Sequence, residues 1–302
     1  MRETNSYQAI LDGVNGSNDL PVLGNYDFFE VGNCAQALSM FAPEEWGDIV
    51  AVLRAFTLTG DLLCATGGND GQVPETINGL FASRGWAEKQ LDIETTVYAY
   101  DRGDLDGMKK KAKTQLKHEK LLDTVDIDDV VQSGLELEKV GNPLGEDIAA
   151  FTQTSIMDRS YQPGYYVDNC KGRVLVDVEW NPKDGNADRD LAAYQAWYEA
   201  GAIDGAVMIT KEIDSCRSLL KTLQDDFYAE HPELRGKKRF ANYGTTTTVS
   251  LTTARKRLQR GGAGPCPVLI VAIGEKTWDQ SKCTGTTLKD KKGGNAEEDN
   301  ES

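Results

Sequence analysis

Apolar residues recur at helical spacing in the first part of the chain. A run that begins at Pro43 has apolar residues every three or four positions, and a second run with this spacing covers residues 74–83. Periodicity of this kind predicts amphipathic helices, and the Pro-Glu-Glu sequence at 43–45 is typical of a helix start. The chain is therefore expected to be mostly helical up to about residue 100.

Strand and helix patterns alternate from residue 164 onward. Two β-rich runs flank a short Lys-Gly turn and predict a β-hairpin over residues 164–181. The expected elements that follow are a helix at about 188–200, a buried strand at 203–210, a helix at about 213–230 and a last strand at 268–273. This order predicts an α/β fold in which a mixed central sheet is flanked by helices.

Composition indicates an ordinary globular protein. The 302 residues include 33 basic and 48 acidic side chains, for a net charge of −15, which by itself argues against a histone-like nucleic-acid binder but not against a local basic patch. No stretch of 18 apolar residues and no signal-peptide core are present, so a cytoplasmic protein with no membrane contact is expected. We expect a single domain over residues 1–287 and a disordered polar tail over 288–302.

Cysteine and histidine usage limits the chemistry. The six cysteines are widely spaced, none lies in a CxxC pair, and reduced thiols are expected. His118 and His231 are the only histidines, which removes three-His zinc sites. Any hydrolytic metal chemistry must then rely on carboxylates, which favour magnesium-like ions.

Two charged segments precede the hairpin. Residues 104–121 carry six lysines on an expected helix, and a solvated helix face is favoured over contact with a polyanion. Residues 122–160 are strongly acidic and are interpreted as a solvated, partly helical insertion. A calcium site is not expected there because no DxDxDG loop is present.

Three carboxylates converge at the predicted hairpin. Asp168 and Asp177 are nine residues apart, one on each strand, and Glu179 shares a strand face with Asp177. Acids this close repel one another unless a cation lies between them. A magnesium-like ion there could polarise a phosphate and activate a water. Solvated acids near a turn are the alternative, but Asp177 and Glu179 interrupt a Val-Leu-Val run of buried character, which favours the functional interpretation.

A basic stretch covers residues 235–260. It holds eight basic residues and no acid, and it combines Phe240 and Tyr243 with hydroxyl-bearing threonines. The basic groups are suited to phosphates, and the polar groups to base edges or thymine methyls. A solvated loop followed by a basic helix is the alternative. The candidate DNA-binding residues are Asn181, Lys183, Lys238, Arg239, Asn242, Tyr243, Thr245, Thr246, Thr247, Thr248 and Arg255.

One string in the chain resembles a known family. Residues 177–184, DVEWNPKD, followed by DRDL at 188–191, resemble the active-site segment of the BglII/BstYI group of type II restriction endonucleases. Residues 243–273 look like that group's recognition loop and last core strand, and residues 45–92 look like its helical N-terminal part. The resemblance extends over roughly residues 45–275.

The resemblance implies a PD-(D/E)xK nuclease fold and a homodimer that cleaves double-stranded DNA within a palindrome with a GATC core. It implies Mg²⁺ as cofactor, with Mn²⁺ as a substitute, held by Asp168, Asp177 and the backbone carbonyl of Val178. Glu179 stands where related nucleases have Lys or Gln, and Glu88 matches a helix residue that supports the metal site.

Asp177 and Glu179 both depart from the usual pattern of the group, in which the second acid is a Glu and is followed two residues later by Gln. These departures leave open a sequence-specific DNA-binding protein that has lost cleavage. A repair nuclease of the same fold with little sequence preference is a separate alternative, and the hydroxyl-rich segment 242–248 between basic flanks suits base readout better than backbone tracking.

Overall fold

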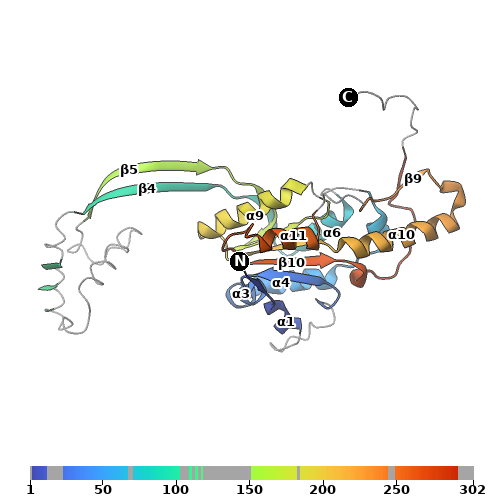
Figure 1. The fold of residues 1–302 in the computed structure, drawn as a ribbon, viewed down its shortest axis with the longest axis horizontal. Coiled ribbons are helices and arrows are strands. Elements are labelled where there is room, and N and C mark those ends of the chain that lie inside the picture. The colour runs from blue at the N-terminus through green and yellow to red at the C-terminus, as the bar shows by residue number, and fades with distance from the viewer. Residues whose placement is uncertain are drawn as a thin grey trace, which may run out of the picture. The chain divides into compact units, whose positions relative to one another are not determined.

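The computed structural model describes residues 2–11, 23–66, 71–102, 109–110, 113–114, 117, 151–181, 184–243 and 249–291. The chain divides into two compact units. The first contains residues 1–91 and 163–302, and the second contains residues 92–162. Figure 1 shows the elements of both units along the chain.

Seven strands form the central sheet of the first unit. In order across the sheet they are β1 (Glu3–Thr4), β2 (Asp27–Val31), β10 (Val268–Ile273), β8 (Gly205–Lys211), β7 (Val174–Val178), β6 (Tyr166–Lys171) and β3 (Ala87–Gln90). Strand β8 pairs in parallel with β7 and β10, and the other pairs are antiparallel. The mixed sheet predicted from the sequence is confirmed.

Helices flank this sheet. They are α1 (Ser6–Leu11), α3 (Cys34–Phe41), α4 (Pro43–Ala55), α5 (Gly60–Cys64), α6 (Gln72–Ala82), α9 (Asp184–Glu199), α10 (Ile213–Glu230) and α11 (Leu251–Gln259), with short 3-10 turns η1 (Pro232–Leu234) and η2 (Glu275–Thr277). Helices α4, α6 and α10 occupy the ranges expected from apolar spacing. Helix α9 begins at Asp184, four residues before the expected start. The N-terminal part is less helical than predicted, because β2 and β3 lie in it.

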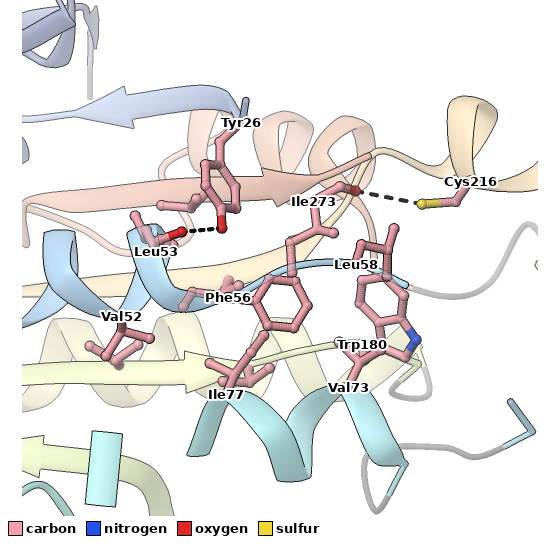
Figure 2. Packing of buried hydrophobic residues seen from close by; sticks show 14 of the residues in the cluster. Tyr26, Val52, Leu53, Phe56, Leu58, Val73, Ile77, Trp180, Cys216 and Ile273 are labelled. Atoms are coloured by element: carbon pink, nitrogen blue, oxygen red, sulfur yellow. Dashed lines mark hydrogen bonds between the residues drawn. The ribbon is translucent and has the colours of Figure 1, made fainter. Parts of the chain in front are cut away.

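The sheet has an apolar core on one face and a partly polar buried layer on the other. Because side chains alternate along a strand, Val174, Val176 and Val178 of β7 share one face. They belong to the main apolar cluster, which includes residues of α4 and α6. Figure 2 shows part of this cluster, including the hydrogen bond that the Tyr26 hydroxyl donates to the carbonyl of Leu53. The opposite face of β7 carries Asp177, toward α9.

Ordered structure continues past the expected end of the domain at residue 287. Strand β11 (Lys289–Asp290) pairs antiparallel with β9 (Lys238–Arg239), and Lys238 forms an ion pair of 2.8 Å with Asp290. Leu288 is buried in the main apolar cluster. No local pattern indicates this pairing, because both the partner strand and the cluster lie far away in the chain. Residues 292–302 lie outside the described residues.

All six cysteines are buried and free, as predicted. Within the described part of the chain, no helix has the length and apolar character needed to cross a membrane.

The second unit contains a two-stranded antiparallel ribbon. Strand β4 (Ile93–Arg102) pairs with β5 (Phe151–Gln162), with register shifts at two points along the pair. Residues 151–160, which were interpreted as part of a partly helical insertion, therefore lie in a strand. The rest of the acidic segment lies outside the described residues. In the lysine-rich segment, residues 109, 110, 113, 114 and 117 are helical, as expected, and the others also lie outside them.

Candidate active site

The β6–β7 hairpin brings Asp168 and Asp177 face to face. The backbone N–H of Asp168 donates to Oδ1 of Asp177 at 2.9 Å. In return, the backbone N–H of Val178 donates to Oδ2 of Asp168 at 2.9 Å. Each carboxylate is thus held by the strand that carries the other. The antiparallel pairing of Asn169 with Val176 sets this register, and the convergence of the two acids follows from the hairpin alone.

Glu179 continues the same face immediately after β7. Its backbone N–H donates to the carbonyl of Ile209 at 2.8 Å, and its own carbonyl accepts from the Thr210 hydroxyl at 2.8 Å. The side chains of Asp177 and Glu179 are only 6% and 5% exposed. The neighbouring strand β8 therefore fixes the backbone of Glu179, and the carboxylate lies in a buried polar layer.

Helix α9 contributes two residues that sequence reasoning did not assign to the site. The Tyr194 hydroxyl donates to Oδ2 of Asp177 at 2.5 Å, and it is fully buried. Asp190, 5% exposed, accepts two hydrogen bonds on Oδ1 from the guanidinium of Arg189, at 2.8 and 2.9 Å. Asp190 is part of the DRDL string that resembles the family pattern, and this was the one sequence feature that could have indicated its place in the site. Its position beside Glu179 depends on long-range packing.

Two buried carboxylate oxygens of this cluster accept no hydrogen bond while Glu179 and Asp190 are both ionised. They are Oε2 of Glu179 and Oδ2 of Asp190. Glu30 is a buried acid elsewhere in the sheet. There the backbone N–H of Ala35 and the Ser6 hydroxyl both donate to Oε2 of the carboxylate at 3.0 Å, and the backbone N–H of Ser6 donates to Oε1. Buried polar atoms are normally satisfied, so orphaned oxygens at one cluster indicate that something else completes it. The Glu30 site is structural, whereas the Glu179–Asp190 site is incomplete.

Mutual repulsion and burial raise the pKa values of these carboxyl groups. Burial, and next the charge of Asp168, raise the pKa of Asp177 to about 7. Burial, and next the charge of Asp190, raise the pKa of Glu179 as well, and a protonated Glu179 donates to Asp190. Burial also raises the pKa of Asp168. Several like-charged acids in a low-dielectric layer shed charge by binding protons, or by binding a cation.

The chemistry of the donor set fits a hard divalent cation. The acids of this cluster offer only oxygen atoms, which Mg²⁺ prefers, and the two oxygens without a donor belong to Glu179 and Asp190. Within the described residues, no three acidic, histidine or cysteine side chains are already arranged to hold a metal ion. Backbone N–H groups engage one oxygen of Asp168 and one of Asp177, and each carboxylate keeps further lone pairs that can coordinate an ion.

The match of Glu88 to the family pattern implied a position on a helix, but Glu88 does not lie on one. It lies in β3, which pairs with β6 through Ala87 and Cys170, and its side chain is exposed. The helix α6 ends at Ala82, and the chain turns at Gly85 before entering the strand. The charge of Glu88 still acts on Asp168, whose pKa it helps to raise. Its place is therefore the rim of the cluster and not its buried part.

Tyr243 is a core residue, contrary to its prediction as a DNA-binding side chain. It is 1% exposed, its hydroxyl donates to the carbonyl of Leu63 at 3.0 Å, and its ring packs edge-on against Trp180 at 6.0 Å. Arg217 donates to its backbone carbonyl at 2.9 Å and 3.1 Å. An apolar ring in a polar sequence context was buried by contacts with distant elements, which the local sequence does not reveal.

The other candidate DNA contacts are spread over separate elements. Lys238 and Arg239 form β9, while Arg255 lies on α11, where it pairs with Glu3 at 3.1 Å and lies over the ring of Phe29. Asn242 is exposed, and Asn181 is half-buried directly after β7. Lys183 and Thr245–Thr248 lie outside the described residues.

The stretch 235–260 therefore does not act as one unpaired basic patch. Acids from other parts of the chain neutralise some of it, as Asp188 does for Arg257 at 2.7 Å. Beside α11 an open hollow of about 410 Å³ retains basic character. Its lining residues are Asp188, Thr253, Lys256, Arg257, Arg260, Gly261 and Gly262.

Comparison with known proteins identifies a family. The family model described as restriction endonuclease BglII/BglIII matches residues 26–273 of the chain. This range includes the hairpin, α9 and β10, and so contains all the residues of the buried acidic cluster. A search of the curated proteins finds no match.

Proposed function

The chain belongs to the BglII/BglIII family of restriction endonucleases, and from this premise we propose that it is a type II enzyme. In this proposal it hydrolyses phosphodiester bonds of double-stranded DNA at a palindromic site with a GATC core. Mg²⁺ is the cofactor, and the enzyme works as a homodimer. The products carry a 5′-phosphate and a 3′-hydroxyl.

The observation that carries the proposal is the incomplete acidic cluster at the end of β7. Asp168 and Asp177 face each other across the hairpin, and Glu179 and Asp190, when both are ionised, each leave one buried oxygen without a donor. Burying Asp177, Glu179 and Asp190 beside the half-buried Asp168 costs stability unless a partner compensates their charges. A purely structural cluster would be expected to satisfy its oxygens internally, as Glu30 does.

Asp168, Asp177 and the backbone carbonyl of Val178 are the residues proposed to hold the Mg²⁺ ion, and Mn²⁺ is expected to replace it. When bound, the ion supplies positive charge that polarises the scissile phosphate and lowers the pKa of the attacking water. Asp177 is one methylene shorter than Glu, and the Tyr194 hydroxyl at 2.5 Å holds its Oδ2. Tyr194 therefore orients this acid from the opposite side to the hairpin.

Glu179 is proposed to orient the attacking water or accept its proton. Burial and the charges of neighbouring acids raise its pKa, which favours the protonated form of the side chain in the metal-free arrangement. It becomes a proton acceptor only when nearby positive charge favours its ionised form. Asp190, fixed by Arg189, adds negative charge beside Glu179 and is proposed to help retain the cation.

DNA binding is proposed to involve the exposed polar residues near the hairpin and α11. Asn181, Lys183, Asn242 and Arg255, with the threonines at 245–248, are the candidates for DNA contacts, and Lys238 and Arg239 are candidates for phosphates. The basic hollow beside α11 offers a further phosphate contact through Lys256 and Arg260. Since a palindrome has twofold symmetry, a twofold dimer places one acidic cluster at each strand.

A plasmid-relaxation assay with matched variants tests the function. Wild-type protein with Mg²⁺ or Mn²⁺ is expected to nick and linearise supercoiled, unmethylated plasmid, and protein in EDTA is expected to leave it intact. Asp177→Asn should lower the rate at least about a thousandfold, because the metal site loses a charged ligand. Asp225→Asn, which removes an exposed acid of α10, should cleave at the wild-type rate.

Other results of this assay point to the alternatives. A folded wild-type protein that binds one DNA sequence selectively but never nicks it would be the cleavage-deficient binder. Metal-dependent degradation to a smear would indicate a nuclease of low specificity. Equal cleavage by wild type and Asp177→Asn would overturn the assignment of the acidic cluster.

A further inference from the structure

A fully buried lysine lies at the end of β8, next to the acidic cluster. Lys211 is 0% exposed, and its ammonium donates to the backbone carbonyls of Trp180 and of Val249, the latter at 3.0 Å. The ammonium also lies 5.6 Å from the ring centre of Trp180 and 6.0 Å from that of Tyr243. In the described part of the chain it makes no ion pair with a carboxylate.

Keeping a cation in this position is costly. Burial lowers the pKa of Lys211 to about 8, which means that the folded protein disfavours the charged form. A methionine or leucine would fill the same volume without that cost. The buried ammonium is held by carbonyls and makes no ion pair with an acid. Stability therefore does not explain why a lysine occupies this position.

One of the two carbonyls, that of Trp180, lies just after β7. Trp180 directly follows Glu179, whose own carbonyl accepts from the Thr210 hydroxyl at 2.8 Å. The last two residues of β8 thus hold two consecutive carbonyls at the end of β7. Any displacement of Trp180 would move the backbone that carries Glu179.

The other carbonyl belongs to the end of the segment proposed to read bases. Val249 follows residues 244–248, and Tyr243 precedes them. Both flanks are held by cations from one short region, because Arg217 of α10 donates to the carbonyl of Tyr243 and Lys211 donates to that of Val249. The Tyr243 ring also packs edge-on against Trp180, with the ring planes at 85°.

We propose that Lys211 is a positioning residue that couples sequence recognition to cleavage. Its single ammonium joins the residue after Glu179 to the residue after the base-reading segment. Base contacts at the correct site that fix the position of the Val249 backbone also fix that of Trp180. The backbone of Glu179 is then held in place as well. A wrong base leaves both displaced, and small misplacements of catalytic groups cost about a hundredfold in rate. This inference rests on the proposed function.

Three substitutions separate this coupling from general loosening. Lys211→Met keeps the aliphatic part of the side chain and removes the ammonium that donates both hydrogen bonds. Thr210→Val removes only the donor to Glu179, on the catalytic side. Lys221→Met makes the same chemical change as the first variant at an exposed position of α10. Thermal melting of all three is measured first, with Lys211→Arg, which keeps the charge and the donors, as a second variant if Lys211→Met fails to fold.

The deciding quantity is discrimination between the cognate site and sites with one altered base pair. It is measured as the ratio of kcat/KM values with Mg²⁺ and as the ratio of Kd values by gel shift with Ca²⁺. Lys211→Met is expected to lower the kcat/KM ratio by at least about tenfold, because both charged hydrogen bonds of the ammonium are lost and each is worth about this factor. Thr210→Val is expected to lower kcat equally at all sites, with an unchanged ratio, and Lys221→Met to behave as wild type.

Two results would overturn the inference while the proposed function stands. One is a ratio for Lys211→Met within about twofold of wild type. The other is an equal fall in the ratio for Thr210→Val, which would indicate general loosening. Recovery of discrimination in Lys211→Arg would support the role of the donors. A wild-type protein that neither cleaves nor binds any sequence preferentially would overturn the proposed function itself, together with the inference.

Discussion

Ionised Asp177 is expected to lower the free energy of unfolding of the metal-free protein. The Asp177→Asn variant should therefore be more stable than wild type when no metal is bound. Asn has the same shape as Asp, and its Oδ1 can still accept from the backbone N–H of Asp168 at 2.9 Å. The Tyr194 hydroxyl can rotate to accept from the new amide instead of donating. Asp177→Asn therefore removes a buried charge without removing the packing around it.

The size of the effect follows from the pKa of Asp177. Burial and the charge of Asp168 raise it from 3.8 to about 7. Since a tenfold change in proton affinity is worth about 1.4 kcal/mol, ionised Asp177 costs up to about 4 kcal/mol of unfolding free energy. The unfolded chain loses the proton first, so the cost appears above pH 4, grows as pH rises, and is complete above pH 7. Below pH 4 the acid is neutral in both states and the two proteins should be equally stable.

Urea denaturation in EDTA from pH 4 to pH 8.5 measures this difference. The Asn variant should gain stability over wild type as pH rises, and Mg²⁺ should narrow the gap by stabilising wild type alone. Asp225→Asn, at an exposed position, serves as the control and should stay within about 0.5 kcal/mol of wild type at every pH. An Asn variant that is less stable than wild type at pH 8, or a gap that does not vary with pH, would refute the reasoning.

Three further predictions concern neighbouring residues. Tyr194→Phe removes the donor that lowers the pKa of Asp177, so the acidic limb of the pH–rate profile should move to higher pH; an unchanged profile would argue against that contact. Asp190→Asn should weaken Mn²⁺ binding by about tenfold in titration calorimetry at pH 7.5, and equal affinity would exclude Asp190 from the metal environment. Tyr243→Phe should cost about 1–2 kcal/mol in denaturant because the Leu63 carbonyl loses its donor, while the rate of DNA cleavage stays the same; a large loss of cleavage would restore Tyr243 as a DNA contact.

Features that depend on neighbours in sequence could be predicted. The hairpin places Asp168 opposite Asp177 because strand pairing across a short turn fixes the register. Alternation then puts Glu179 on the same face as Asp177. Helices α4, α6 and α10 followed from apolar spacing for the same reason, since each is encoded by residues within a few turns of one another.

Features that depend on distant partners could not be predicted. Asp190 lies beside Glu179 because α9 packs on that face of the sheet, and no local pattern gives that distance. Arg255 and Arg257 are paired with Glu3 and Asp188, so a stretch that contains no acid in sequence is partly neutralised in space. Strand β5 was not predicted, because the acidic composition of the segment before it favoured a solvated insertion. Tyr243 was assigned to DNA by its polar neighbours, while its ring is buried against Trp180.

The most direct test of the account is digestion of fully sequenced, unmethylated phage DNA with the purified protein and Mg²⁺, followed by sequencing of the fragment ends. Discrete fragments are expected, with ends that carry 5′-phosphates and share one palindrome with a GATC core. Ends without a common sequence, or DNA left intact by protein that is folded and binds Mg²⁺, would contradict it.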